Sequence, residues 1–410
     1  MKALFSLTLL LFFCAAGCSQ TTAFDNLMNL AKHQFVCDTS QNADYTFSIN
    51  VLKKAIGLRP NSAEAHYYLG NAYGRLNSRN GETIPDSKMP LVVKASVELE
   101  KVISIDPLYK GEIIELDPYS KITAEWGSLA LCYLVNNKPD SAAWAFKEGK
   151  KRGGFDDFIL SISRAVLNGC SKNAILLSSG DNFTFPLYYL KTIENVRPDI
   201  SFFDVGLLNT SWFPRFAQRT TNLKFGINEP TLDTLGYRFW SATTISVPIE
   251  QTGKFFTWLV KPSYNGKYLL RGDLLFISLL KENKFQRDVY LTEGFSDDEK
   301  LSLGDRLSKY PLLEKINEKN EADESIDQYV DNVKSIVSTF KPVNTNSQTE
   351  CTSIDILRWQ IIDKIKEIEK NDPTGENKLY KLLTDDLPLG RYPCYDNDEL
   401  MKYLKSIEVK

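Results

Sequence analysis

Two neighbouring side chains, Asp181 and Asn182, stand just before a stretch with helical spacing and could bind a hydroxyl group or an anion. The start of a helix favours such ligands because its first backbone N–H groups have no partner within the helix. The same residue types are also favoured helix caps, whose side-chain oxygens accept those N–H groups with no ligand present. Both interpretations stay open from the sequence.

The remaining candidates lie between residues 188 and 273. Asn209 sits in a second polar cluster, and the ring of Tyr188 or Trp212 could form the floor under a sugar or a peptide. Arg271 and Asp273 flank a glycine and could be a surface ion pair, a helix start or a binding pair. The candidate ligand-binding residues are therefore Asp181, Asn182, Tyr188, Asn209, Trp212, Arg271 and Asp273.

Catalytic and metal chemistry find little support in the sequence. With only two histidines, His33 and His66, a multi-histidine metal site is excluded and a Ser–His–Asp site has no convincing base. The patterns Gly-x-Ser-x-Gly and HExxH, and a phosphate-binding glycine loop with Lys, do not occur. We expect no catalytic residue, no metal and no cofactor, and the sequence favours a non-enzymatic protein while leaving an enzyme as the alternative. The net charge of −3 gives no support to nucleic-acid binding.

The candidate residues would be positioned by a three-layer α/β domain over residues 155–300, with a mainly parallel sheet. The short spacing of the first two apolar runs predicts a strand–helix–strand crossover. In such sheets ligands bind at the carboxyl ends of the strands, where Asp181 and Asn209 would lie. The predicted strands are Ala174–Ser179, Ile200–Leu208 and Asp288–Thr292, and the predicted helices are Thr184–Glu194, Trp212–Arg219 and Gly272–Asn283.

Several motifs of this domain occur in the order of a known family. They are Cys170–Leu177, Gly180–Tyr189, Val196–Asp199, Leu207–Trp212, Gly266–Leu269, Leu279–Asn283 and Arg287–Tyr290. The succession resembles the soluble C-terminal portion of multi-spanning bacterial membrane proteins related to protein O-mannosyltransferases, whose core has no known function. Phe183 stands where that family usually has a second Asp. The catalytic carboxylate of such transferases lies in their membrane part, so the resemblance implies an accessory or binding domain.

Helical repeats are predicted for residues 18–154. After Trp126, the residues Leu129, Ala130, Tyr133, Ala142, Phe146 and Gly149 follow at offsets of 3, 4, 7, 16, 20 and 23. This spacing resembles the tetratricopeptide repeat, in which small residues let two helices approach and large ones fill the groove between them. A generic array of helical hairpins is the alternative, and either would bind an extended peptide or a partner protein.

Two earlier stretches follow the same pattern. One reads His66, Leu69, Gly70, Tyr73, then Ala95, Leu99 and Val102 after an enlarged loop over Asn77–Pro90, and a half-unit at Ser48, Leu52 and Ala55 precedes it. His66 occupies the first aromatic position of its repeat. We therefore expect it to be a packing residue and not a ligand or a base.

The N-terminus carries a targeting pattern over residues 1–17. One Lys precedes about ten apolar residues, and this run is too short for a comfortable membrane span of about 20 residues. Ala15-Ala16-Gly17-Cys18 resembles the lipobox of bacterial lipoproteins, which implies a lipid on Cys18; an ordinary signal peptide with an incidental Cys18 is the alternative. With no acidic residue next to Cys18, the resemblance implies a lipid-anchored protein of the bacterial cell envelope, at the outer membrane.

The cysteines do not predict a disulfide framework. Apart from the lipidation candidate Cys18, five remain after the signal segment, an odd number without metal-ligand spacing, so we expect mostly buried free thiols. They are Cys37, Cys132, Cys170, Cys351 and Cys394.

Residues 301–410 are predicted to be a helical C-terminal region. Apolar residues recur at helical spacing over Ile326–Val337, Ile354–Ile365 and Leu379–Leu383, and Asp396–Val409 reads as a last helix. The charged run Glu314–Glu324 is expected to be a connection or an exposed helix.

These patterns favour one function and leave two alternatives. The first is a cell-envelope lipoprotein that acts as a non-catalytic protein-binding or assembly module, with an envelope protein or peptide as partner of the repeats and the membrane reached through the lipid. The second is a carbohydrate-handling accessory protein or enzyme with its site at the strand ends. The third is a structural spacer.

Overall fold

The computed structural model describes residues 22–36, 43–78, 81–317, 324–368, 372–394 and 397–408. The signal segment, Cys18 and Cys37 lie outside these ranges. The chain forms two compact units, the first from residues up to 132 together with 147–154, and the second from residues 133–146 together with 155–410. Each unit has its own core and is described by itself.

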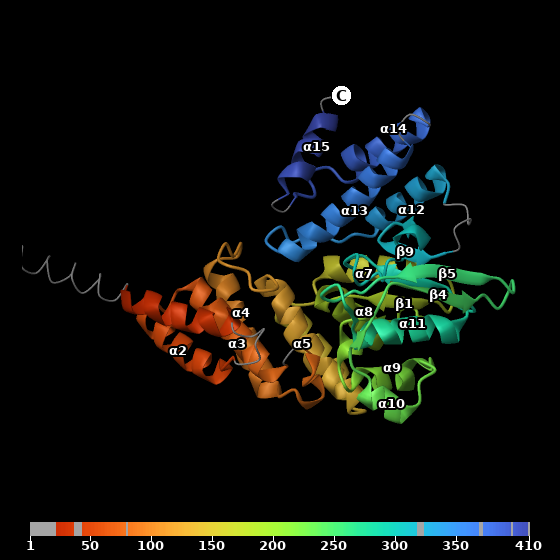
Figure 1. Cartoon of the computed structure of the whole chain (residues 1–410). Helices are drawn as coiled ribbons and strands as arrows, with labels where there is room; N and C mark the ends of the chain where they lie inside the picture. The colour runs from red at the N-terminus through yellow and green to blue at the C-terminus, as the bar shows by residue number, and fades with distance from the viewer. Residues whose placement is uncertain are drawn as a thin grey trace, which may run out of the picture. The chain divides into compact units, whose positions relative to one another are not determined.

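The first unit consists of antiparallel helix pairs, as the repeat pattern predicts. Its helices are residues 22–36, α2 (Tyr45–Leu58), α3 (Ala63–Asn77), α4 (Met89–Ile105), most of α5 (Pro118–Val135) and the end of α6 (Pro139–Lys151). Local sequence explains where helices start: Asp44 and Ser62 accept the backbone N–H groups of Phe47 and Ala65 at 2.9 and 3.2 Å. The helices α2, α3 and α4 run side by side (Figure 1).

The enlarged loop predicted for Asn77–Pro90 is confirmed. It connects α3 to α4 through the short helix η3 (Ile84–Asp86). Asn77 holds both ends of the loop, because its carbonyl accepts the hydroxyl of Thr83 at 3.0 Å and its Oδ1 accepts the backbone N–H of Lys88 at 2.7 Å.

The second unit is built on a five-stranded sheet with the order β2-β1-β7-β9-β8. The first three strands pair in parallel and the last two are antiparallel, so the predicted, mainly parallel sheet is confirmed. All four residues of β1, β2 and β7 are buried, which explains their continuous apolar sequences. The strands are β1 (Ile175–Ser178), β2 (Ser201–Asp204), β7 (Val289–Thr292), β8 (Leu307–Tyr310) and β9 (Leu313–Ile316).

Helices cover both faces of this sheet. Phe202 on β2 packs against Tyr188 of α8 with 4.5 Å between ring centroids. The next residue, Phe203, points to the opposite face and lies near Phe225, whose carbonyl accepts the Ser278 hydroxyl of α11. The helices of this layer structure are α7 (Asp157–Gly169), α8 (Asp181–Ile193), η4 (Leu207–Asn209), α9 (Phe213–Thr221) and α11 (Arg271–Asn283).

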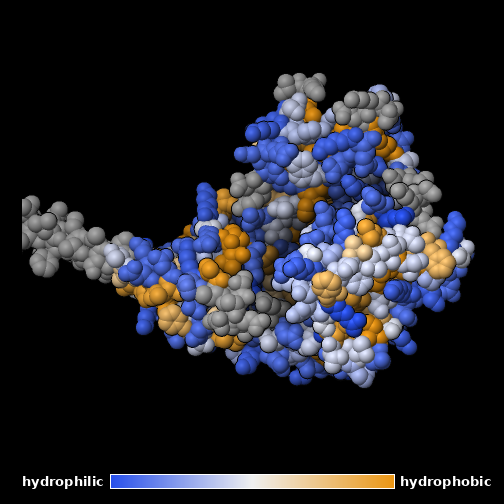
Figure 2. All heavy atoms as spheres, in the orientation of Figure 1, coloured by the Kyte–Doolittle hydropathy of each residue, from blue (hydrophilic) through white to orange (hydrophobic). Residues whose placement is uncertain are grey.

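Two small sheets, which the sequence patterns do not predict, lie between α9 and α11 in the chain. Tyr237, Phe239 and Phe255 in this region are 63–70% exposed. In Figure 2 this side of the second unit carries hydrophobic residues among neutral ones. The elements are α10 (Glu229–Thr234), β3 (Arg238–Phe239) paired with β6 (Tyr268–Leu269), and β4 (Thr243–Pro248) paired with β5 (Phe255–Val260).

The C-terminal region is helical from residue 326 onward, but residues 307–316, which were predicted to belong to this helical region, form strands β8 and β9 of the sheet. The expectation for the charged run Glu314–Glu324 is wrong at its start, because Glu314–Ile316 belongs to strand β9; residues 318–323 of the run lie outside the described ranges. Glu314 can be buried there because its Oε2 pairs with Lys300 at 2.7 Å. No helix in the described ranges is long and apolar enough to span a bilayer. The helices are α12 (Ile326–Ser338), α13 (Gln348–Ile368), α14 (Pro373–Lys381), the π-helical turn η6 (Leu382–Asp386) and α15 (Asp398–Glu408).

Candidate functional site

The helix pairs of the first unit pack through the small and aromatic residues that the repeat pattern singles out. A Cβ added at Gly70 of α3 would lie 2.9 Å from the Leu99 side chain and 3.2 Å from the Ala95 carbonyl, both on α4. Trp126 of α5 is completely buried, and its indole N–H donates to the hydroxyl of Ser96 at 3.0 Å. The array therefore has the close helix–helix contacts that tetratricopeptide spacing predicts.

His66 is a buried packing residue, as predicted, and it also joins three segments. Its Nδ1 lies 2.5 Å from the carboxylate of Glu98 on α4, and its Nε2 lies 3.0 Å from the carbonyl of Pro60. Because both neighbours are acceptors, this geometry favours the protonated ring, in which both nitrogens donate. Burial alone would lower the pKa of His66, but the hydrogen bonds to Glu98 and Pro60 outweigh it and raise the pKa.

A second set of α3 side chains points away from α4, and we call it the α3 polar face. One tyrosine anchors it: the Tyr67 hydroxyl donates to the carbonyl of Leu116 at 2.8 Å and accepts the backbone N–H of Ile114 at 3.0 Å. The ring of Tyr67 stacks on Tyr109 with 4.7 Å between centroids. Residues 107–117, the connection from α4 to α5, thus lie against this face. The α3 polar face consists of Glu64, Tyr67, Tyr68, Asn71 and Arg75 of α3, with Lys32 from the helix 22–36.

Charges complete the contact between the α3 polar face and residues 107–117. The Glu112 carboxylate accepts the Tyr68 hydroxyl at 2.7 Å and pairs with Lys32 at 3.0 Å, and Arg75 pairs with Glu115. The Tyr68 hydroxyl, followed by Lys32, lowers the pKa of Glu112. Burial and the Glu112 charge raise the pKa of Tyr68. The face therefore holds an acidic segment through two cations and two tyrosines.

In the second unit, Asp181 and Asn182 form the first turn of α8. The residue that caps this helix is Gly180, which adopts a φ of +87°. The Asp181 side chain is exposed in that turn, where a negative charge interacts favourably with the helix dipole. The Asn182 amide donates to the hydroxyl of Thr349 on α13 at 3.2 Å. A ligand-binding role for these two residues stays a prediction.

Asn209, Arg271 and Asp273 come together at the start of α11. The Asn209 Oδ1 accepts the Gly272 N–H at 2.7 Å, and Asp273 accepts the Leu270 N–H at 2.7 Å. The buried Arg271 donates to the carbonyl of Leu232 at 2.8 Å. Burial raises the pKa of Asp273, while hydrogen bonds from Ser263 and Leu270 oppose the shift. Of the three interpretations given for Arg271 and Asp273, the contacts are those of a helix start.

The two aromatic candidates lie apart from these residues. Tyr188 is 8% exposed and packs on Phe202 in the core between α8 and β2. Trp212 packs on Phe216 and lines a cavity of about 550 Å³ together with Arg215 and Arg219.

Sequence reasoning missed the most deeply buried carboxylate at the strand ends, Asp204. Its Oδ2 accepts the Thr184 hydroxyl at 2.5 Å and the Gly180 N–H at 3.2 Å, and its Oδ1 accepts the Leu207 N–H at 2.8 Å. Burial raises the pKa of Asp204, although these hydrogen bonds oppose it. Asp204 ties the loop after β1 to the loop after β2. In the sequence, Asp204 could have been noticed only as a single Asp that follows an apolar stretch.

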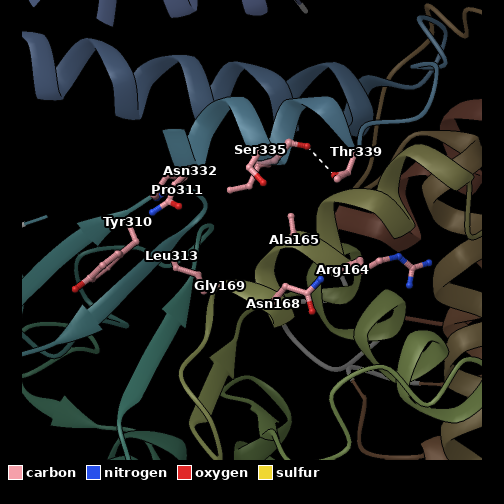
Figure 3. A pocket seen from close by; sticks show the side chains of 11 residues that line it. Arg164, Ala165, Asn168, Gly169, Tyr310, Pro311, Leu313, Asn332, Ser335 and Thr339 are labelled. Atoms are coloured by element: carbon pink, nitrogen blue, oxygen red, sulfur yellow. Dashed lines mark hydrogen bonds between the residues drawn. The ribbon is translucent and has the colours of Figure 1, made fainter. Parts of the chain in front are cut away.

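A cavity of about 340 Å³ lies between α7 and α12, beside the turn from β8 to β9 (Figure 3). This turn sits at the carboxyl end of β7, because Leu313 pairs with Thr292. Arg164 extends away from the cavity and pairs with Glu194 at 2.7 Å. Asn168 and Ser335 line the cavity with Tyr310 and Thr339, so it offers amide and hydroxyl groups and no unpaired charge.

The described residues contain no group of three or more His, Cys, Asp or Glu side chains that could hold a metal ion. Four of the five cysteines predicted to be mostly buried thiols are described and free. Cys132, Cys170 and Cys351 are buried and Cys394 is half-buried. Burial raises the pKa of both Cys170 and Cys394 to about 12, so neither is an activated thiolate at neutral pH.

Two family models match parts of the chain. One, described as TMEM260-associated domain 2, matches residues 159–228, and the other, described as a TPR repeat, matches residues 42–77. No curated protein and no solved structure matches the chain. The matches support a tetratricopeptide repeat joined to a TMEM260-like domain, and the repeat supports a protein-interaction module.

Proposed function

We propose that this protein is a lipid-anchored protein of the bacterial cell envelope that binds a partner protein through its helical repeats without catalysis. The observation that carries the proposal is the array of closely packed helix pairs around Gly70 and Trp126, because such arrays present extended binding surfaces. A lipid on Cys18 would confine the array to the membrane surface and raise its effective concentration there.

Exposed apolar side chains on the repeats support a partner of this kind. Leu30, Leu76 and Val97 are 43–51% exposed. In Figure 2 the visible side of the repeat helices shows hydrophobic residues between hydrophilic ones. Mixed surfaces of this type are common where proteins associate.

Capture of envelope proteins by the full chain tests the binding function. We compare the wild type with a repeat variant, Leu30→Ser, Leu76→Ser and Val97→Ser. A matched control loses three exposed apolar residues of the second unit: Phe239→Ser, Phe255→Ser and Leu259→Ser. The repeat variant is expected to lose specific partners that the control keeps. Loss in the control alone would contradict a role for the repeats.

Metabolic labelling with palmitate tests the anchor. Cys18→Ser is expected to abolish the label and to release the protein from membranes, and Cys14→Ser, four residues earlier, is expected to change neither. Sedimentation of the membrane fraction measures the release. Retention of the label in Cys18→Ser would remove this part of the proposal, and fractionation of the two membranes tests the outer-membrane location.

A second candidate function is the binding of a small neutral ligand such as a sugar in the cavity between α7 and α12. The observation that favours it is the lining of amide and hydroxyl groups around Asn168 and Ser335, with Tyr310 beside them. Its volume of about 340 Å³ falls within the range of small-molecule sites.

Calorimetric titration with a panel of monosaccharides and disaccharides tests this second function. Ser335→Trp fills the cavity from an exposed helix position and is expected to abolish binding, whereas Ser338→Trp, at the end of the same helix and outside the lining, is expected to preserve it. Binding that persists in Ser335→Trp would exclude this cavity as the site.

A further inference from the structure

The connection between α4 and α5 is longer than the repeat spacing requires. Pro60 stands six residues before His66, whereas Pro107, at the corresponding place, stands 19 residues before Trp126. The additional residues fall within 107–117, which form neither helix nor strand. They lie on the α3 polar face, and we call them the acidic segment.

The acidic segment fits its face through three side chains spaced three residues apart. Tyr109 is 7% exposed and stacks on Tyr67. Glu112 pairs with Lys32, and Glu115 pairs with Arg75. The contact thus uses one buried ring followed by two carboxylates, and it runs along α3 from Tyr67 to Arg75.

The acidic segment is nonetheless attached through few backbone hydrogen bonds and through partly exposed ion pairs. No backbone group of residues 108–116 bonds to another backbone group among the described residues. Two hydrogen bonds link the backbone of residues 108–116 to α3, and both use the hydroxyl of Tyr67. The side chains of Glu112 and Glu115 remain 60% and 43% exposed. Segments with few backbone bonds and exposed ion pairs open at low free-energy cost.

We propose that the acidic segment is an internal occupant of a protein-binding surface, and that an extended acidic segment of a partner protein displaces it from the α3 polar face. The partner segment has an aromatic residue followed by two carboxylates at three-residue intervals. The inference rests on the proposed binding function of the repeats and names the chemistry of their partner.

The charges of the face explain why the partner segment is acidic. Lys32 is 29% exposed and contacts Glu64 as well as Glu112. Its pKa is raised, because the hydrogen bonds that it donates to Glu64 and Glu112 outweigh the effect of burial, and the amine stays charged. When the acidic segment leaves, Lys32 and Arg75 each lose one carboxylate, and an incoming carboxylate restores it. Covalent attachment gives the internal segment a high effective concentration, so it competes strongly with any partner.

A labelled synthetic peptide with the sequence of residues 107–117 serves as the probe, and fluorescence polarisation measures its binding to the full chain. The released variant carries Tyr109→Ala, Glu112→Ala and Glu115→Ala. We expect it to bind the peptide at least about tenfold more tightly than the wild type does, because its own segment no longer competes. A peptide with Lys in place of both Glu residues is expected not to bind.

Two further variants keep the result decisive. The milder pair Glu112→Gln and Glu115→Gln leaves Tyr109 in place, and circular dichroism confirms that each variant is folded. Adding Lys32→Glu and Arg75→Glu to the released variant is expected to abolish binding of the acidic peptide and to create binding of the Lys peptide. Equal affinity of wild type and folded variants, or no binding by any of them, overturns the inference. Capture of partners by the repeats would still stand in that case, since it is measured without the peptide.

Discussion

At the scale of single residues, His66 links the chemistry of one ring to the packing of three segments. The Glu98 carboxylate lies beside Nδ1 and the Pro60 carbonyl lies beside Nε2, and both are acceptors. This arrangement favours a ring in which both nitrogens donate. Lys101 is a nearby positive charge that opposes the protonated form, and Glu98 outweighs it. His66 therefore occupies the aromatic packing position of its repeat and, in addition, has a raised pKa that favours the protonated ring.

The stability contribution of this proton depends on pH. Because the pKa of folded His66 is raised above 6.5, the contribution is fully present below the unfolded value of about 6.5 and is lost as pH rises through the folded value. We expect His66→Phe to lower the free energy of unfolding by about 1.5–3 kcal/mol at pH 5.5 and by less at pH 9. Urea unfolding at both pH values measures the difference. Glu98→Gln should reduce the same pH dependence, and a His66→Phe effect independent of pH would contradict the charged ring.

At the scale of elements, two glycines in neighbouring helices offer a direct comparison. Gly70 in α3 has Leu99 and Ala95 within 3.2 Å of an added Cβ, whereas Gly57 in α2 has nothing within 4 Å. The same substitution should therefore act in opposite directions.

We expect Gly70→Ala to destabilise the chain by about 1–3 kcal/mol, because the added methyl group forces α3 and α4 apart. Gly57→Ala should stabilise it by up to about 1 kcal/mol, since alanine is the better helix former. Urea unfolding followed by circular dichroism measures both. A stabilising Gly70→Ala would show that the helix pair is not closely packed there.

A buried arginine organises the C-terminal helices. Arg358 of α13 is fully buried, pairs with Asp355 at 2.9 Å and donates to the carbonyls of Leu387 and Tyr392 at 2.8 and 2.5 Å. It thereby fixes the turn-rich segment that precedes α15.

Arg358→Met is expected to cost about 3–5 kcal/mol, because it leaves the Asp355 charge and two carbonyls without their donor. The double variant with Asp355→Asn should cost less, since the buried charge is then gone. Arg391→Met, at an exposed position of the same segment, is the matched control and should cost less than about 1 kcal/mol. Thermal unfolding ranks the three, and equal losses in Arg358→Met and Arg391→Met would contradict the buried network.

The elements also show why part of the structure was predictable. Strands β1, β2 and β7 are buried on both faces, so their apolar runs are unmistakable. Strand β9 escaped prediction because its charged residues, Glu314 and Lys315, are neutralised by partners far along the chain. The β4–β5 hairpin alternates buried and exposed residues, but the apolar Phe255 and Leu259 occupy exposed positions, which obscures the usual pattern.

The sequence correctly indicated which polar residues lie at the ends of strands and helices, but it did not indicate which groups they bond to. Asn209 and Asp273 are indeed polar groups at element ends, but they bond to the first turn of α11. Two of the three donors to Asp204 named above come from the loop after another strand and from a helix residue 20 positions earlier, and no local sequence pattern predicts that they meet.

At the scale of the whole molecule, the chain has two compact units with separate cores. A lesion in one core should remain within its unit, because local opening follows local packing. We expect Leu291→Ala, in the middle of β7, to speed hydrogen exchange throughout the five-stranded sheet and to leave α2–α4 unchanged. Mass spectrometry of the exchanged peptides measures this. Equal acceleration in α3 would mean that the units unfold together.

The assignment of residues 133–146 and 147–154 to different units means that the backbone changes unit three times, within α5, within α6 and after Gly154. A design that transfers the repeats to another protein therefore cannot use a single boundary in the sequence. A piece that stops at Gly154 includes residues 133–146 but lacks the residues against which they pack. Phe146, for example, would lose its contact with the ring of Tyr189. Such grafts would need that stretch redesigned with a water-compatible surface before they could stay in solution.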